Sequence, residues 1–228
     1  MRAILIPVKE FAEAKKRLAS HFSLEDRAAL ARALCQDFFR MIAGVRGVDR
    51  IFVVSKEPEV LAAAESAGWS AIVESHQSSE SASVDFASRH CAAMGVTALL
   101  RVPIDIPLAE PRDIQALFNG LNGAPEAVIV PSGDGTGTNA LLRTPPTAFP
   151  SRFGPGSFSL HLAEAEAAGV PARVMRNARI EHDLDELDDL RRIAPFVPAR
   201  GATARWFQDR AEYFGAAPHM RAASASLP

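Results

Sequence analysis

The sequence predicts an α/β fold of three layers, with a mostly parallel sheet between helices. Short apolar runs of strand length alternate with helical patterns along most of the 228 residues, and the links between them are short. The first run, residues 3–8, is apolar on both faces, as in a parallel strand covered by helices on both sides. The hydrophobic content of 48% and the charged content of 23% are those of an ordinary globular protein.

The first helix follows a basic loop at residues 9–21. Ser23 precedes Asp26 by three residues, a pattern that caps the starts of helices. Apolar residues then recur at helical spacing to about residue 43, where glycines end the pattern. We therefore expect an amphipathic helix over this segment.

The rest of the chain continues the alternation of strands and helices. Strands are expected at residues 50–55, 71–73, 97–102, 126–130, 139–143 and 173–176. Helices are expected at residues 57–67, 110–120, 156–168 and 186–193, with a further helix that ends at Met94. Residues 74–83 are polar and rich in Ser, which predicts a loop over the sheet edge leading into that further helix.

The character of the sequence changes after residue 194. We expect one domain over residues 1–194 and a C-terminal extension over residues 195–228. Aromatic residues in a polar context within the extension indicate a helix that docks on the domain or on a second subunit, the latter as in a homodimer. The last residues of the chain, about ten of them, are expected to be disordered.

Composition argues against several kinds of partner. The net charge of −2 gives no electrostatic reason to bind nucleic acid or an anionic membrane. No apolar run approaches the roughly 20 residues that span a bilayer, and the N-terminus lacks a signal-peptide pattern, so we expect a cytoplasmic protein. Cys35 and Cys91 both lie in helical patterns and are expected to be buried thiols.

Three aspartates form the strongest chemical signal. Asp105 is the only ionisable residue of a Pro-flanked turn after the strand at residues 97–102, and open α/β sheets bind ligands at such strand ends. Asp183 and Asp185 follow far down the chain, and together the three offer hard oxygen ligands suited to Mg²⁺. The alternatives are an Asx-turn at Asp105 and an acidic helix start at the other two.

Two glycine-containing segments are candidates for binding an anion. Residues 132–139 carry three glycines at alternate positions, which expose backbone N–H donors, and Thr138 and Asn139 add side-chain donors. No Gly-Lys-Ser/Thr follows, so the segment is not a P-loop, and a flexible hairpin is the alternative. Gly154 and Ser157 stand before a helix and would line an anion pocket, although Ser157 could equally be a simple N-cap.

The basic loop after the first strand carries Lys9, Lys15 and Arg17. These cations could neutralise a polyphosphate as charge builds on a leaving group, although such a run is more often a solvated face. The histidines, His161 among them, show no ligand spacing and are expected to be ordinary packing or surface residues. The Gly-x-Ser-x-Gly motif of a nucleophilic serine is absent from the sequence.

Taken in order, these segments resemble the 2-phospholactate guanylyltransferase family of deazaflavin coenzyme biosynthesis, which includes relatives that use phosphoenolpyruvate or 3-phosphoglycerate. The matching segments are Ile6-Pro-Val-Lys9, Ala14-Lys-Lys-Arg-Leu18, Val102-Pro-Ile-Asp-Ile-Pro-Leu108, Gly135-Thr-Gly-Thr-Asn139, Arg152-Phe-Gly-Pro-Gly-Ser157 and Asp183-Leu-Asp185. The family's Gly-Leu-Asn element is replaced here by Ser81-Ala-Ser-Val-Asp85, so we expect different contacts to the nucleotide base or the acceptor from this segment.

The resemblance implies a GT-A-like nucleotidyltransferase fold and a Mg²⁺-dependent guanylyltransferase. The phosphate of a small acid (3-phospho-D-glycerate, phosphoenolpyruvate or 2-phospho-L-lactate) would attack the α-phosphorus of GTP and release pyrophosphate. Asp105, Asp183 and Asp185 would carry the Mg²⁺. Lys15 and Arg17 would hold the triphosphate.

The same resemblance assigns Thr138, Gly154 and Ser157 to the acceptor acid. The attacking phosphate is already anionic, so the reaction needs positioning and charge neutralisation rather than a strong base. Other interpretations stay open from the sequence. They are a CTP- or UTP-dependent nucleotidyltransferase, a GT-A glycosyltransferase and a non-catalytic nucleotide-binding module.

Overall fold

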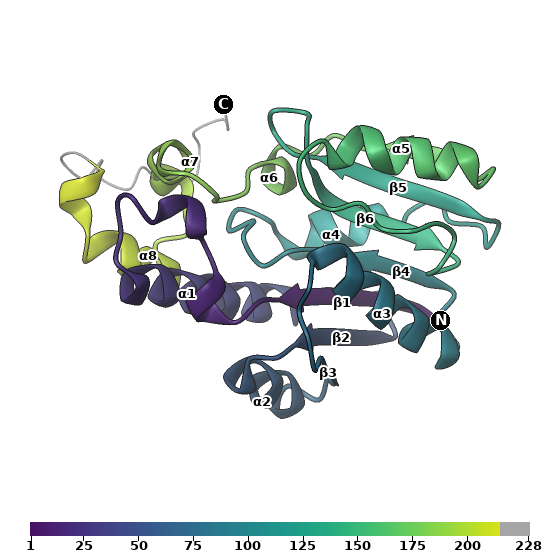
Figure 1. Ribbon diagram of the computed structural model, residues 1–228, viewed down its shortest axis with the longest axis horizontal. Helices are drawn as coiled ribbons and strands as arrows, with labels where there is room; N and C mark the ends of the chain where they lie inside the picture. The colour runs from purple at the N-terminus through teal and green to yellow at the C-terminus, as the bar shows by residue number, and fades with distance from the viewer. Residues whose placement is uncertain (215–228) are drawn as a thin grey trace.

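The computed structural model describes residues 1–214 and centres on a seven-stranded sheet with the order β3-β2-β1-β4-β6-β5-β7 (Figure 1). The strands are β1 (Arg2–Val8), β2 (Arg50–Ser55), β3 (Ser70–Val73), β4 (Ala98–Arg101), β5 (Glu126–Pro131), β6 (Thr138–Thr144) and β7 (Ala172–Val174). Strand β6 pairs antiparallel with β4 and β5, whereas the other pairings are parallel. The predicted mostly parallel sheet is therefore confirmed.

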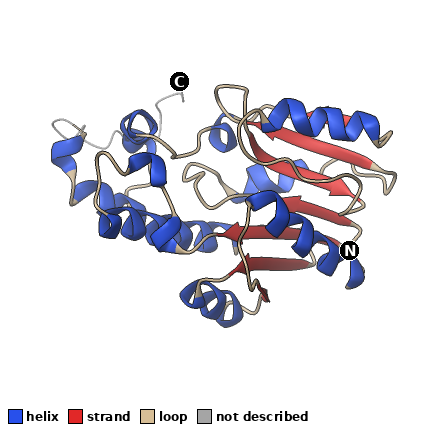
Figure 2. Ribbon diagram, viewed as in Figure 1, coloured by secondary structure: helices blue, strands red, loops and turns tan. Residues whose placement is uncertain are grey.

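Helices cover both faces of the sheet and make the three predicted layers (Figure 2). They are α1 (Leu24–Ile42), α2 (Pro58–Ser66), α3 (Glu80–Ala93), α4 (Pro111–Leu117), α5 (Ser157–Ala167), α6 (Ala178–Glu181), α7 (Leu187–Ile193) and α8 (Ala202–Gln208). On one face, α1, α2 and α4 share a core with Ile4 and Val53. On the other, α3 packs with Leu5 and Phe52, and α5 with Ile129. Because successive residues of a strand point to opposite faces, an apolar β1 fills both cores.

The first helix begins as predicted. Ser23 Oγ accepts a hydrogen bond from the Asp26 N–H at 3.0 Å, and α1 then runs for 19 residues. Its buried face includes Leu30, Leu34 and Phe38, which recur at the predicted helical spacing.

The start of α3 corrects the predicted loop at residues 74–83. The helix begins at Glu80, because Ser79 Oγ accepts the Ala82 N–H at 3.1 Å and caps it. A Ser-rich stretch therefore supplies a helix start here as well as a loop. This shift places the first turn of α3 beside the candidate site.

Two further details differ from the expected elements. Ser157 is the first residue of α5 rather than its N-cap; the cap position belongs to Gly156, whose φ of 70° is a left-handed conformation that favours glycine. The short helix α6 has no counterpart among the expected elements. Its N-cap is Asn177, whose side-chain oxygen accepts the N–H groups of Arg179 and Ile180 at 3.0 and 3.2 Å.

The segment after residue 194 docks on α1. Trp206 Nε1 donates a hydrogen bond to the Asp26 carbonyl at 3.0 Å. The Asp37 carboxylate accepts the N–H groups of Ala202 and Thr203 at 3.0 and 2.8 Å and thereby caps α8. Of the two predicted arrangements, docking on the body of the same chain is the one observed.

Residues 215–228, where disorder is predicted, lie outside the described part of the chain. The division into domains at residue 194 stays a prediction. Within the described residues, no helix combines the length and apolar character needed to cross a membrane. Cys35 and Cys91 are buried, as predicted, and burial raises the pKa of both thiols to about 12.

The contact between Asp37 and α8 can be tested at Gly201. A Cβ at Gly201 would lie 2.5 Å from Asp37 Oδ2. We expect Gly201→Ala to lower the free energy of unfolding by about 1–2 kcal/mol, because the carboxylate has to leave the cap. Asp37→Ala should cost a similar amount, and the double variant should cost less than the sum of the two. Urea denaturation of the four proteins measures this, and strictly additive losses would contradict the contact.

Candidate active site

The acidic segments meet where β4 ends. The loop after β4 carries Asp105, and the link between α6 and α7 carries Asp183, Leu184 and Asp185. The Leu184 N–H donates to the Asp105 carbonyl at 3.0 Å, and the Leu184 side chain is fully buried. A backbone hydrogen bond thus joins two segments that lie about 80 residues apart in the chain. The structure therefore joins the two segments that carry the three aspartates.

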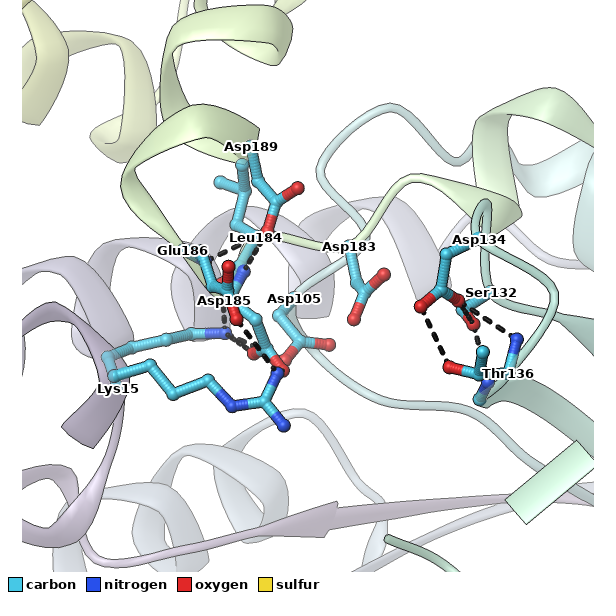
Figure 3. A network of polar contacts seen from close by, with 12 residues as sticks. Lys15, Asp105, Ser132, Asp134, Thr136, Asp183, Leu184, Asp185, Glu186 and Asp189 are labelled. Atoms are coloured by element: carbon cyan, nitrogen blue, oxygen red, sulfur yellow. Dashed lines mark hydrogen bonds and ion pairs between the residues drawn. The ribbon is translucent and has the colours of Figure 1, made fainter. Parts of the chain in front are cut away.

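Lys15 lies between two of these carboxylates (Figure 3). Its Nζ is 2.8 Å from Asp105 Oδ2 and 3.1 Å from Asp185 Oδ1, and it also donates to the Leu184 carbonyl. Its side chain is only 7% exposed. The backbone of Lys15 has a φ of 52°, the one positive value among the non-glycine residues described. A left-handed lysine costs about 1–2 kcal/mol, so this local strain is offset by the contacts that the side chain makes.

Charge is unevenly compensated among the three aspartates. Burial and the neighbouring Asp105 and Asp185 raise the pKa of Asp183 to about 6. Lys15 holds the pKa of Asp185 below its ordinary value, with Arg17 and Lys9 adding to the effect. Burial alone would lower the pKa of Lys15, but Asp105 and Asp185 raise it. The ammonium therefore stays charged, while Asp183 is left without a cationic partner in the described chain.

This donor set fits a divalent cation. Two carboxylates already converge on the single positive charge of Lys15, and Asp183 adds uncompensated negative charge next to Asp105. Hard oxygen ligands of this kind are the ones that Mg²⁺ prefers. Within residues 1–214, however, no group of three or more His, Cys, Asp or Glu side chains is arranged closely enough to form a metal site as it stands. The metal role of Asp105, Asp183 and Asp185 stays a prediction.

The other predicted cations are more exposed. Arg17 is 60% exposed in its side chain, and its Nη1 lies 3.4 Å from Asp185 Oδ2. Lys9 is exposed at the end of β1. Lys16 is also at the surface, where it pairs with Glu13 rather than with one of the three aspartates. Of the basic run, Lys15 is thus the residue that enters the acidic cluster.

The glycine-rich loop is tied to the acidic segment through Asn139. Its Nδ2 donates to Asp183 Oδ1 at 3.2 Å and to the carbonyls of Ile180 and Glu181 at 2.9 and 3.0 Å. The Gly133 N–H also donates to the Glu181 carbonyl, at 2.8 Å. Asn139 is buried, so in this structure its side chain orients Asp183. Its predicted contact with substrate is not tested by these bonds.

Thr138 is linked to the segment around Gly154 by a buried histidine. His161 Nε2 accepts the Arg152 N–H at 2.8 Å, so the proton of the neutral ring belongs on Nδ1, which donates to Thr138 Oγ1 at 3.0 Å. Burial, together with the charges of Arg101 and Arg143, lowers the pKa of His161 to about 3. The sequence predicts an ordinary packing residue here. The structure adds a bridging role between two substrate-binding candidates.

The first turn of α3 holds the same segment from the other side. Ser81 Oγ accepts the Phe153 N–H at 2.8 Å. Asp85 accepts the Ser151 N–H with both carboxylate oxygens, each at 3.1 Å. Ser81 and Asp85 are one helical turn apart and therefore share a face. Ser81 and Asp85 thus fix the backbone that leads to Gly154, a role with no local signal in the sequence.

A cleft of about 680 Å³ brings these elements together. Its lining includes the predicted site residues Lys9, Lys15, Arg17, Asp105, Gly154 and Asp185. Three other predicted residues lie outside the lining but bond to residues of it. The carbonyls of Thr138 and Asn139 accept hydrogen bonds from Arg101 at 3.4 and 3.3 Å. The Ser157 N–H donates to the Gly154 carbonyl at 3.1 Å. Arg101 and Glu80 also line the cleft, although neither was predicted as a site residue from the sequence.

Comparison with known proteins decides the family. Residues 1–207 match the family described as guanylyl transferase CofC like. The chain belongs to this family. A phosphoenolpyruvate guanylyltransferase of Rubrobacter xylanophilus is 38% identical over 189 residues, which is 83% of this chain and 91% of that protein. A 2-phospho-L-lactate guanylyltransferase of Methanothermobacter thermautotrophicus is 32% identical over 189 residues, 83% of this chain and 82% of that protein.

The fold of this CofC-like chain also occurs in solved structures. A protein from Desulfovibrio desulfuricans G20, assigned as a nucleotide-diphospho-sugar transferase, aligns with a TM-score of 0.72 at 17% identity, covering 93% of this chain and 96% of that one. At that identity the likeness concerns the fold alone. The predicted GT-A-like architecture and the predicted guanylyltransferase class, a kind of nucleotidyltransferase, are both confirmed at the level of the family.

His161 predicts a pH-dependent stability. Its pKa in the folded chain is about 3, against an ordinary value of 6.5, so between these values only the unfolded chain takes up the proton. Neutral His161 makes its full contribution to the free energy of unfolding above pH 6.5. That contribution falls as the pH decreases, by up to about 1.4 kcal/mol per pH unit. His161→Gln removes this titration and keeps an acceptor for the Arg152 N–H.

The measurement is the difference in unfolding free energy between wild type and His161→Gln at pH 5, 6, 7 and 8. Other titrating groups are shared by the two proteins and cancel in the difference. We expect the advantage of the wild type to shrink as pH falls from 7 to 5. A difference that stays constant over this range would show that His161 is not held neutral.

Proposed function

We propose that this chain transfers the guanylyl group of GTP to the phosphate of a small phosphorylated carboxylic acid in deazaflavin coenzyme biosynthesis. The candidate acids are 3-phospho-D-glycerate, phosphoenolpyruvate and 2-phospho-L-lactate. The observation that carries the proposal is that Asp105 and Asp185 meet Lys15 in the lining of one cleft, with Asp183 in the same acidic segment as Asp185. The relatives from Rubrobacter and Methanothermobacter, both named guanylyltransferases, support the choice of guanylyl transfer.

The reaction is a substitution at the α-phosphorus of GTP. An oxygen of the acceptor phosphate forms a bond to that phosphorus, the bond from it to the α,β-bridging oxygen breaks, and pyrophosphate leaves. The acceptor oxygen is anionic before attack, so no strong general base is required. The work left to the protein is to place two anions in line and to balance the charge that moves to pyrophosphate.

In this proposal Asp105, Asp183 and Asp185 hold Mg²⁺, which supplies charge neutralisation for the phosphates when bound. Lys9 and Arg17 are exposed cations in the lining of the cleft and are assigned to the triphosphate. Lys15 contributes its positive charge at the same place and keeps Asp105 and Asp185 aligned.

The acceptor acid is assigned to the other wall of the cleft. In the proposal this wall consists of Gly154 in the lining, together with Thr138, Asn139 and Ser157, which lie outside the lining and bond to residues of it. Supporting observations are the position of Gly154 in the lining and the bonds of His161, which keep the two segments in register. A backbone fixed in advance lowers the entropy lost on binding a small acid.

Product analysis tests the function directly. Purified protein is incubated with GTP, Mg²⁺ and each of the three acids in turn, and the products are analysed by mass spectrometry. We expect a guanosine diphosphate-linked product with at least one acid, together with pyrophosphate. Parallel incubations with CTP, UTP and ATP establish the base. Absence of product with all three acids would overturn the proposal.

The metal role predicts the behaviour of Asp105→Asn. The amide keeps the shape of the side chain but removes the negative charge, so we expect the Mg²⁺-dependent release of pyrophosphate to fall by at least about 100-fold. The backbone bond from Leu184 to the carbonyl of residue 105 is unaffected, so the fold should persist.

Asp188→Asn is the matched control, because the Asp188 side chain is 90% exposed and pairs only with Arg191 among the described residues. We expect its pyrophosphate release to equal that of the wild type. Full activity of Asp105→Asn, with circular dichroism unchanged, would remove Asp105 from the metal site.

A further inference from the structure

Arg101 is a buried cation in the wall of the catalytic cleft. It is the last residue of β4, its side chain is 7% exposed, and it lines the cleft. Its Cζ lies 4.1 Å from the centroid of the ring of Phe153, the residue that precedes Gly154 in the chain. Burial lowers the pKa of Arg101 to about 10, and the nearby Asp105 and Asp183 oppose that shift. The guanidinium therefore stands between the acidic cluster and the acceptor wall.

The hydrogen-bonding capacity of Arg101 is only partly used. Its Nη1 reaches the carbonyls of Thr138 and Asn139 at the long distances of 3.4 and 3.3 Å, and its Nε is buried without a partner in the described chain. Its one anionic partner among residues 1–214 is Glu80, which contacts Nη2. A guanidinium has five N–H donors in a fork that matches a carboxylate, so this residue can accept a second anion or exchange the first.

Glu80 is suited to be exchanged. It is the first residue of α3, its side chain is 27% exposed, and it lines the same cleft. Within residues 1–214 its carboxylate pairs with Arg101 alone. The capping of α3 depends on Ser79 rather than on Glu80. The Glu80 carboxylate can therefore leave Arg101 without loss of the helix start.

The other cations of the lining have different surroundings. Lys16 and Arg17 are more than half exposed, and Lys56 pairs with Glu10 at 3.0 Å. Lys15 is committed to the acidic cluster. Arg101 alone among the cations of this lining is both buried and adjacent to the acceptor wall.

We propose that Arg101 binds the carboxylate of the acceptor acid and that Glu80 occupies the guanidinium until the acid displaces it. This rests on the proposed function, because it assumes that the second substrate is a phosphorylated carboxylic acid. Arg101 then selects acids over simple phosphate esters, while the acceptor phosphate lies toward Asp105 and Asp183. Glu80 acts as an internal competitor that lowers the affinity for the acid.

The test compares ligands that differ in the carboxylate only. One pair is 3-phospho-D-glycerate and the glycerol phosphate of the same configuration at C2, in which CH₂OH replaces the carboxylate. The other is 2-phospho-L-lactate and isopropyl phosphate, in which a methyl group replaces it. Isothermal titration calorimetry gives the dissociation constants with Mg²⁺ and a GTP analogue in which a methylene group replaces the α,β-bridging oxygen, so the measurement does not depend on turnover.

For the wild type we expect the acid of at least one pair to bind about 10- to 100-fold more tightly than its carboxylate-free partner. Arg101→Gln should reduce this ratio to near one and leave binding of the GTP analogue within about twofold. Arg101→Lys, which keeps the charge without the fork, should give an intermediate ratio. Glu80→Gln should tighten binding of the acid several-fold and leave the carboxylate-free ligand unchanged.

Arg143→Gln is the matched control. Arg143 is buried on the neighbouring strand β6 beside Asp85, but it is not part of the cleft lining. We expect this variant to lose stability and to keep the ratio of the wild type. Should Arg101→Gln fail to fold, Arg101→Lys and Glu80→Gln carry the test.

Two results would overturn the inference. One is that folded Arg101 variants keep the wild-type ratio of dissociation constants between the two ligands of a pair. The other is that Glu80→Gln weakens the binding of both ligands of a pair equally, as expected if the ion pair is purely structural. Failure of the proposed function would give a different result. The wild type would then form no guanosine diphosphate-linked product detectable by mass spectrometry, whatever the ratio of the dissociation constants.

Discussion

The site depends on one buried ammonium group. Lys15 Nζ contacts Asp105, Asp185 and the Leu184 carbonyl, and so joins the first loop of the chain to the segment after α6. Carboxylates gathered at a sheet edge repel one another, and a buried charge without a partner is costly. Lys15 resolves both problems with one charge, and its left-handed backbone is the local strain that this placement requires. This contact adds to the backbone bond between Leu184 and Asp105 and to the hydrogen bond from Asn139 to Asp183, which also hold the loops that carry the aspartates.

The opposite wall is fixed by side chains that bind backbone atoms. His161, Ser81 and Asp85 each accept an N–H group of residues 151–153, and His161 also donates to Thr138. Asn139 then ties this wall to Asp183. The result is a cleft whose two sides are set by the fold before any substrate arrives. For an in-line phosphoryl substitution, where positioning provides much of the rate, such preorganisation is the main contribution a protein can make.

How much of the fold and of the site could be predicted depends on how far apart in the sequence the interacting residues lie. The strands and most helices are encoded locally, by apolar runs and by caps such as Ser23, and they match the structure to within a few residues. Asp105 could be found because strand ends of parallel sheets share one edge. Ser81, Asp85 and His161 could not, since their partners are backbone atoms of a distant loop, which carry no sequence signature. The cap at Gly156 instead of Ser157 depends on a backbone angle that the residue types alone leave open.

Two buried cations of the cleft are compensated in the same way. Lys15 with Asp105 and Asp185, and Arg101 with Glu80, each join a buried cation to a partly exposed carboxylate. Such pairs keep the buried charges compensated, because unpaired buried charges would destabilise the fold. Internal partners achieve this and hold the groups in place at the same time. Binding then exchanges one ionic partner for another rather than creating a new buried charge, and the affinity for each ligand is set by how weakly the internal partner is held.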